Sequence, residues 1–198
     1  MKPWLAAAAA LAISSCLTQK QVPGDPIGNF AFEATLPLEG DSEVGPGTCA
    51  LAEVPDAGFS FSATFSRDPV TGQAYAEVGG VQRLDTTLDG PLLISNASAP
   101  RIFAQCKCDG VTVVETLKVV LLTPEQNRLA QDTCPDHPFD GGLSPDDGGI
   151  YPSPATGAAY NAIRACGVLI DVVEPPDGGC GEECPRCELH YRLNGGRR

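Results

Sequence analysis

Cysteines are the residues of this 198-residue chain whose type and number could do the most chemistry. Of the nine, Cys16 closes an apolar N-terminal segment, and the other eight lie farther along the chain. Those eight are Cys49, Cys106, Cys108, Cys134, Cys166, Cys180, Cys184 and Cys187. An even set of cysteines is typical of a disulfide framework in an exported protein, so all eight are disulfide candidates.

Spacing restricts the pairing of these cysteines only slightly. Cys106 and Cys108 are two residues apart in a predicted strand, so their side chains point to one face with Cα atoms about 6.5–7 Å apart. That separation favours bonds to two different partners, and Cys49 and Cys134 are the nearest candidates on either side. We then expect the cysteines of the C-terminal tail to pair among themselves and with Cys166.

A metal site and a redox site are the alternatives for the same thiols. Cys106-x-Cys108 and Cys184-x-x-Cys187 together could supply four thiolates to a zinc ion. Cys184-x-x-Cys187 also has the spacing of a thioredoxin-like redox motif, which requires a strand before it and a helix after it. Here a glycine-rich segment precedes the motif and a strand-like tail follows, so we expect a disulfide-stapled loop and no metal.

Acidic side chains gather in a Gly- and Pro-rich stretch, residues 135–157, where Asp140, Asp146 and Asp147 stand beside pairs of glycines. Carboxylate and carbonyl oxygens on flexible backbone are ligands that calcium prefers. The spacing matches no EF-hand loop, so a solvated acidic loop is the main prediction and a calcium site the alternative.

The sequence offers little for catalysis. Its two histidines, His137 and His190, lie in loop-like sequence and on the outer face of a predicted strand, respectively. The chain has no Gly-x-Ser-x-Gly nucleophile motif, no phosphate-binding P-loop and no His-Glu-x-x-His zinc motif. We therefore expect a non-enzyme, and an enzyme built from scattered carboxylates is the remaining alternative.

The first sixteen residues indicate where the protein is located. Lys2 provides a basic start, Trp4 to Ile13 form an apolar run, and the small residues Ser14 and Ser15 lead into Cys16. The run has the length of a secretory signal core and is shorter than the about 18 residues that cross a bilayer. This arrangement resembles the lipobox of bacterial lipoproteins.

The resemblance implies that residues 1–15 are a signal peptide that is removed before Cys16. The Cys16 sulfur would then carry diacylglycerol, with fatty acids such as palmitate, and no other cofactor is expected. Leu17 in place of aspartate favours the outer membrane, on its periplasmic or its surface-facing side. The resemblance thus predicts a lipid anchor in the cell envelope, where an oxidising environment suits disulfides.

Beyond Cys16, residues 16–27 are rich in Pro and Gly and predict a tether, and residues 28–198 predict one domain. The formal net charge of −12 argues against binding to nucleic acid. The expected partners are the membrane, through the lipid, and another envelope protein or a glycan. We expect a non-catalytic binding or structural role, with a small-ligand or calcium-binding module as the alternative.

Period-two alternation of apolar residues predicts strands throughout the domain, and a single helix is predicted. The strands are expected at residues 30–36, 59–65, 73–78, 81–88, 92–95, 101–108, 111–122, 164–174 and 187–193. Thr123, Pro124 and Gln126 form a capping-box sequence that opens the helix. Many short strands between Gly/Pro turns predict a mainly β antiparallel sandwich, of immunoglobulin-like or jelly-roll type.

Overall fold

The computed structural model describes residues 23–36, 58–100, 110–134, 158–176 and 186–198. The structure is mainly β, with 67% strand and one short α-helix. The strands are β1 (Asp25–Thr35), β2 (Phe59–Arg67), β3 (Ala74–Val78), β4 (Val81–Arg83), β5 (Asp85–Asp89), β6 (Leu92–Pro100), β7 (Thr112–Leu122), β8 (Arg164–Glu174) and β9 (Cys187–Arg197). The helix α1 spans Pro124–Leu129, and a short 3₁₀ helix spans Ala158–Asn161.

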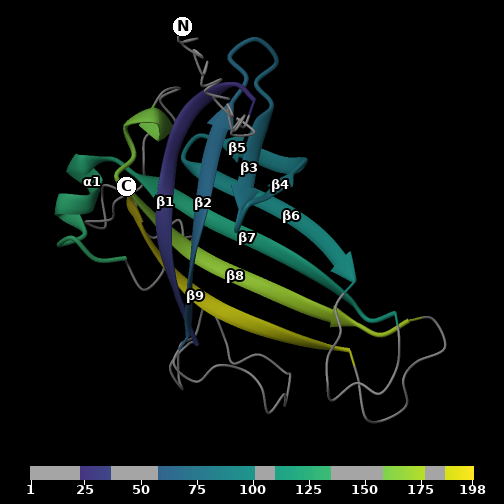
Figure 1. The fold of residues 1–198 in the computed structure, drawn as a ribbon. Helices are drawn as coiled ribbons and strands as arrows, with labels where there is room; N and C mark the ends of the chain where they lie inside the picture. Colours follow the sequence, from purple (N-terminus) through teal and green to yellow (C-terminus); the bar gives the residue numbers. More distant parts are fainter. Residues whose placement is uncertain (1–22, 37–57, 101–109, 135–157, 177–185) are drawn as a thin grey trace, which may run out of the picture.

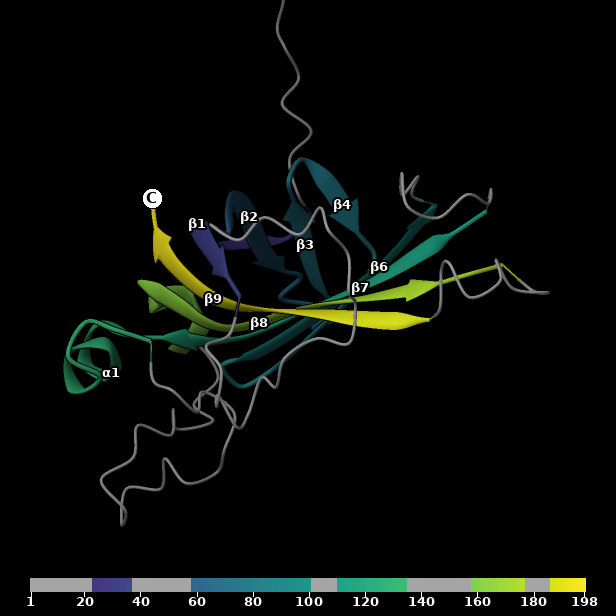
Figure 2. The ribbon, with the colours of Figure 1, turned by 90° about the horizontal axis from the view of Figure 1, so that it is seen from below.

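All nine strands form one antiparallel sheet in the order β4-β3-β2-β1-β9-β8-β7-β6-β5 (Figure 1). Sequential strands pair as neighbours except β4 and β5, which form the two edges of the sheet. The first strand, β1, also pairs with the last, β9, from Phe30↔Arg197 to Thr35↔Arg192. This pairing joins a four-stranded meander, β1–β4, to a five-stranded one, β5–β9. In Figure 2 the β1–β4 half lies above the long strands β6–β9, so the sheet curves strongly.

The sheet is nearly closed into a barrel by one bent segment, residues 81–89. Its first part, β4, pairs with β3, and its second part, β5, pairs with β6, with only Leu84 between them. The two edges of the sheet are therefore formed by two consecutive segments of the chain, β4 and β5. If β4 and β5 are counted as one bent strand, the nearly closed sheet resembles an up-and-down barrel of eight strands.

The expected two-layer sandwich is not confirmed, and a single barrel-like sheet takes its place. Alternation along a strand shows which face is buried, and it does so equally for a sandwich and for a barrel. The predicted strand at residues 101–108 lies outside the described residues. Within the described chain β7 pairs with β8 and with β6, which extends from the predicted 92–95 to Pro100.

The barrel interior is filled by side chains at alternate positions of each strand. Phe30 and Phe32 of β1 and Phe65 of β2 are fully buried at its centre, with ring centroids 5.6–6.3 Å apart. Gly195 of β9 faces Phe32, and an added Cβ there would lie 2.5 Å from the ring. A glycine at this position therefore lets the ring pack against the backbone of β9.

Local sequence explains the turn between β2 and β3. The Asp68 carboxylate accepts hydrogen bonds from the backbone N–H groups of Val70 (2.8 Å) and Thr71 (3.2 Å), and these bonds lower the pKa of Asp68. Gly72 follows with a φ of 75°, which only glycine adopts freely. The hairpin predicted from Asp68 to Gly72 is thus confirmed.

The predicted helix is confirmed together with its capping box. The backbone N–H of Gln126 donates to the Thr123 hydroxyl, and the Gln126 side chain accepts from the backbone N–H of Thr123 at 2.8 Å. Pro124 occupies the first turn, where its missing N–H costs no hydrogen bond. With six residues, α1 is far too short to cross a bilayer, and no other helix in the described ranges is long and apolar enough to do so.

One disulfide, Cys134–Cys166, fastens the segment after α1 to the outside of β8, with Cα atoms 5.4 Å apart. This bond corrects the expected pairing of Cys134 with a residue of the 106–108 pair and of Cys166 with the tail. Cys166 points away from the barrel interior and packs with Val120 and Leu122 of β7. The turn after α1 returns over this outer face, which brings Cys134 to Cys166.

Candidate functional site

A cavity of about 410 Å³ opens at one end of the barrel interior, and we call it the mouth pocket. Its lining is formed by Phe59, Phe61, Val78, Gly79, Val81, Arg83, Ala97, Ala99, Val113, Glu115 and Leu169. Ala97 and Ala99 of β6 lie on the inward face of the strand, where the earlier inward positions hold Leu93 and Ser95. The small side chains of this end of β6, together with Gly79, leave the space open.

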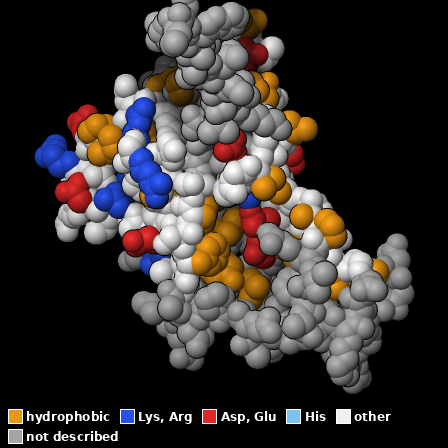
Figure 3. All heavy atoms as spheres, in the orientation of Figure 1, with side chains coloured by type: hydrophobic (Ala, Val, Ile, Leu, Met, Phe, Trp, Pro, Cys, Tyr) orange, Lys and Arg blue, Asp and Glu red, His pale blue; other side chains and the backbone are white. Residues whose placement is uncertain are grey.

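Aromatic rings form one wall of the mouth pocket. The Phe59 ring meets Tyr191 of β9 edge-on at 5.0 Å, and the Phe61 ring stacks on Phe32 at 5.0 Å. Burial decreases along β2 from Phe65 through Phe61 to Phe59, which is 37% exposed. The wall therefore runs continuously from the packed core to solvent. Figure 3 shows hydrophobic side chains exposed beside charged ones on this face of the molecule.

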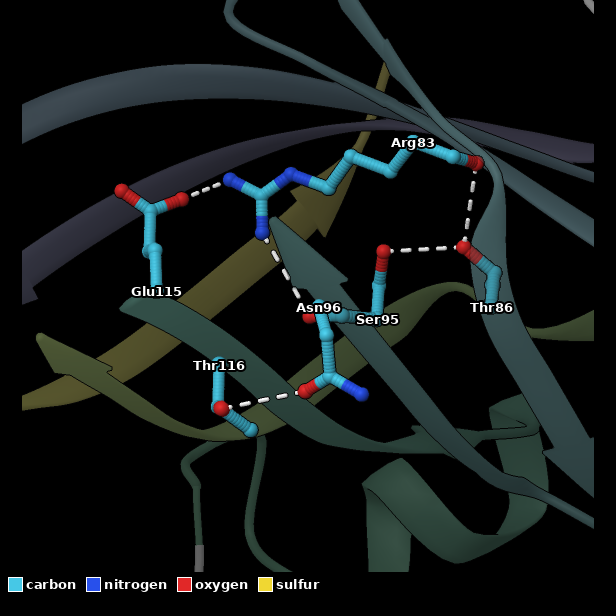
Figure 4. Close-up of polar contacts among 6 residues, drawn as sticks. All are labelled: Arg83, Thr86, Ser95, Asn96, Glu115 and Thr116. Atoms are coloured by element: carbon cyan, nitrogen blue, oxygen red, sulfur yellow. Dashed lines mark hydrogen bonds and ion pairs between the residues drawn. The ribbon is translucent and has the colours of Figure 1, made fainter. Parts of the chain in front are cut away.

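An ion pair between Arg83 of β4 and Glu115 of β7 crosses the barrel at the floor of the mouth pocket (Figure 4). The Arg83 side chain is only 5% exposed and that of Glu115 is 19% exposed. Arg83 Nη2 contacts Glu115 Oε1, and Arg83 Nη1 donates to the backbone carbonyl of Ser95 at 3.4 Å. Burial lowers the pKa of Arg83 to about 10, against the opposing effect of the Asp171 carboxylate, so Arg83 remains charged at neutral pH.

Hydroxyl groups hold the bend between β4 and β5 in place beside this ion pair. Thr86 Oγ1 donates to the carbonyl of Arg83 (3.3 Å) or shares a hydrogen bond with Ser95 Oγ (2.9 Å). The Gln73 side chain donates to the carbonyl of Thr86 at 3.0 Å, across the edge where β3 and β5 form no ladder. These side-chain bonds replace backbone ladder bonds and fix the position of Arg83.

Glu115 and Asp171 lie directly opposite each other on β7 and β8 and share the inward face. Directly opposed like charges destabilise a sheet unless a cation offsets them, and Arg83 is the cation adjacent to both. Burial and, to a smaller extent, the Asp171 charge raise the pKa of Tyr191. Within the described ranges no three metal-ligating side chains converge.

A second depression, of about 580 Å³, lies on the outer face of β1, β2 and β9 and is somewhat more open than the mouth pocket. Its polar rim includes Glu33, Arg164 and Arg198. The Arg164 guanidinium donates hydrogen bonds there to the side-chain oxygens of Asn127 (2.5 Å) and Asn194 (2.6 Å). This depression is larger but more open and mostly polar, whereas the mouth pocket is lined mainly by apolar side chains, so the mouth pocket is the stronger candidate for an apolar ligand.

The structure places few of the sequence-predicted site residues. Cys134 and Cys166 are joined, and Cys187 at the start of β9 is also disulfide-bonded. His190 lies on the outer face of β9, away from the mouth pocket, with its Nε2 atom 3.2 Å from Oε2 of Glu188. The other predicted residues, Cys16, Cys49, Cys106, Cys108, Cys180, Cys184, Asp140, Asp146, Asp147 and His137, lie outside the described residues.

Sequence reasoning missed both members of the Arg83–Glu115 pair. For Glu115 a signal existed, because it takes an inward position between Val113 and Leu117 in an otherwise apolar alternation. A charge at such a position predicts a buried partner. No local sequence pattern identifies Arg83 as that partner, because β4 and β7 are far apart in sequence and approach each other only when the sheet curves into a barrel.

Comparison with known proteins finds no family model, no curated protein and no solved structure that matches this chain.

Proposed function

We propose that this protein is a lipid-anchored component of the bacterial cell envelope that binds a small, largely apolar molecule in the mouth pocket, without catalysing a reaction. The N-terminal sequence ending at Cys16 supports the anchor. The mouth pocket is the observation that carries the binding role, because an eight-stranded barrel has room either for its own side chains or for one small ligand. Clefts and cavities of several hundred Å³ with mostly apolar walls are typical ligand sites.

The anchor is tested on the natural protein by the mass of its N-terminal peptide. We expect the chain to begin at Cys16 and to carry diacylglycerol on the sulfur. Cys16→Ala should lose labelling by radioactive palmitate and leave the membrane fraction. The distant Cys134→Ala/Cys166→Ala double variant should keep the label. A natural product that retains residues 1–15, or carries a free thiol at Cys16, contradicts the proposal.

The ligand site is tested by filling it. Ala97 lines the mouth pocket, whereas its neighbour Ser98 is exposed on the outer face of the same strand. We expect the uncharged fluorescent dye N-phenylnaphthylamine to bind the wild-type protein, and Ala97→Phe to weaken its binding at least tenfold. Ser98→Phe adds a phenyl group outside the barrel and should leave binding unchanged. Equal dye binding by all three proteins would refute the mouth pocket as the site.

A further inference from the structure

The mouth pocket contains one pair of charges on an otherwise apolar wall, and that pair restricts the chemistry of its ligand. We propose that the ligand is an uncharged, largely apolar molecule with one hydrogen-bond donor, a hydroxyl group or an N–H, which donates to the carboxylate of Glu115. This inference rests on the proposed binding role and adds the class of ligand. Three observations carry it: the charge balance, the exposure of each partner and the composition of the wall.

Charge balance favours an uncharged ligand. Arg83 and Glu115 are the only charged residues among those that line the described pocket, and they pair with each other. Asp171 lies opposite Glu115 on the same inward face, so Arg83 offsets only one of two carboxylates. An anion would be repelled there, and a cation would lose its hydration in a largely apolar space beside carboxylates that Arg83 already partly neutralises. Removing an ion from water in that way costs far more than removing a hydroxyl group. The net charge of −12 adds a further penalty for anions.

The exposure of the two partners decides between a donor and an acceptor on the ligand. The Arg83 side chain is 5% exposed, and its Nε is buried without a hydrogen-bond partner within the described part of the chain. The Glu115 side chain is 19% exposed, and within the described residues Arg83 contacts one of the two Glu115 carboxylate oxygens, Oε1. A carboxylate has about four acceptor positions. An incoming molecule thus meets an acceptor at the pocket floor and must supply the donor.

The remaining wall suits the apolar body of such a ligand. Phe59 and Phe61 form one side, and Val113 and Leu169 form the opposite side on β7 and β8. Val81 at the rim is 63% exposed, so apolar surface extends from the pocket to its edge. Burying these side chains under a ligand favours binding by about 25 cal/mol for each Å² removed from water.

The test compares four ligands, each with an eight-carbon chain, that compete with N-phenylnaphthylamine on the wild-type protein. Octanol carries the donor, and its methyl ether keeps the chain and the oxygen but cannot donate. Octylammonium and octanoate carry a positive and a negative charge. We expect octanol to bind about tenfold more tightly than the ether, because hydrogen bonds to charged groups contribute at least that factor. Both ions should bind more weakly than octanol.

A variant separates the role of the ion pair from its effect on folding. Removing Glu115 alone would leave Arg83 charged and buried, and removing both would leave the inward Asp171 carboxylate without its cation. The informative change is therefore the triple variant Arg83→Met/Glu115→Leu/Asp171→Asn. It keeps the volume and the apolar wall of the pocket. We expect it to bind the ether as tightly as the wild type does and to lose the tenfold preference for octanol.

The outcomes distinguish the two levels of the proposal. Equal binding of octanol and its ether to the wild type would overturn the donor, and tightest binding of octylammonium or octanoate would overturn the uncharged ligand. In both cases the binding role would stand, since the ligands still displace the dye. If the dye binds equally to the wild type and to Ala97→Phe, the binding role itself fails.

Discussion

Removing the Cys134–Cys166 disulfide should destabilise the protein by an amount that the length of the closed loop predicts. The two cysteines are 32 residues apart in sequence. In the chain-entropy treatment, closing a loop of this length lowers the conformational entropy of the unfolded chain by about 12 cal/mol/K. That loss stabilises the folded state by about 3.7 kcal/mol at 25 °C. Cys166 is also completely buried, so its replacement by alanine adds a small loss of packing. Folded domains have about 5–15 kcal/mol of total stability, so the loss is large but not necessarily fatal.

The measurement is urea denaturation of the wild type and of Cys134→Ala/Cys166→Ala, followed by circular dichroism because the only tryptophan, Trp4, lies in the predicted signal peptide. We expect a lower transition midpoint and a free energy of unfolding reduced by about 3–4 kcal/mol. Binding of N-phenylnaphthylamine should persist in the folded variant, because neither cysteine lines the mouth pocket. A loss below about 1 kcal/mol, or a peptide map that joins Cys134 to another cysteine, would refute this reasoning.

Two further predictions concern the barrel wall. Gly195→Ala should cost about 1–3 kcal/mol of stability in thermal or urea unfolding, because its new methyl group would overlap the Phe32 ring. Gly196→Ala, with no atom within 4 Å of its Cβ, should change stability by less than about 0.5 kcal/mol. Similar losses from both would contradict the packing of Phe32. Tyr191 should ionise above pH 10.0, since burial raises its pKa in the folded state, and its contribution to stability should be present below that pH and disappear as the pH rises through the folded-state pKa. The difference in phenolate absorbance between the wild type and Tyr191→Phe measures this titration, and a midpoint at or below pH 10.0 would count against a buried ring.

Local features of this fold could be predicted from sequence because the physics that produces them is local. Alternation of Phe59, Phe61 and Phe65 with polar residues depends only on which face of one strand is buried. The cap of α1 depends on Thr123 and Gln126, three residues apart, and the structure contains it as expected. In each case the residues that decide the structure are neighbours in the chain.

Closure of the sheet is different, because it depends on residues that no short window of sequence contains. The pairing of β1 with β9 joins residues about 160 positions apart, and alternation is satisfied equally by a sandwich. The bend at Leu84 was also invisible, since residues 81–88 have the composition of one continuous strand. The same segment nevertheless leaves β3 to pair with β6, and this change of partner makes a barrel of the two meanders.

The candidate site follows from that closure and from nothing more local. Arg83 stands at the end of a three-residue strand and Glu115 near the middle of an eleven-residue one, and each is an ordinary surface residue type when considered alone. Arg83 points inward opposite Ala76 of β3, where its charge can be buried at moderate cost if it pairs across the barrel. The inward Glu115 satisfies that requirement, and the alanines at the end of β6 leave the space beside the pair unfilled. The features that close the barrel are therefore the same ones that give its mouth an apolar wall and a single polar contact.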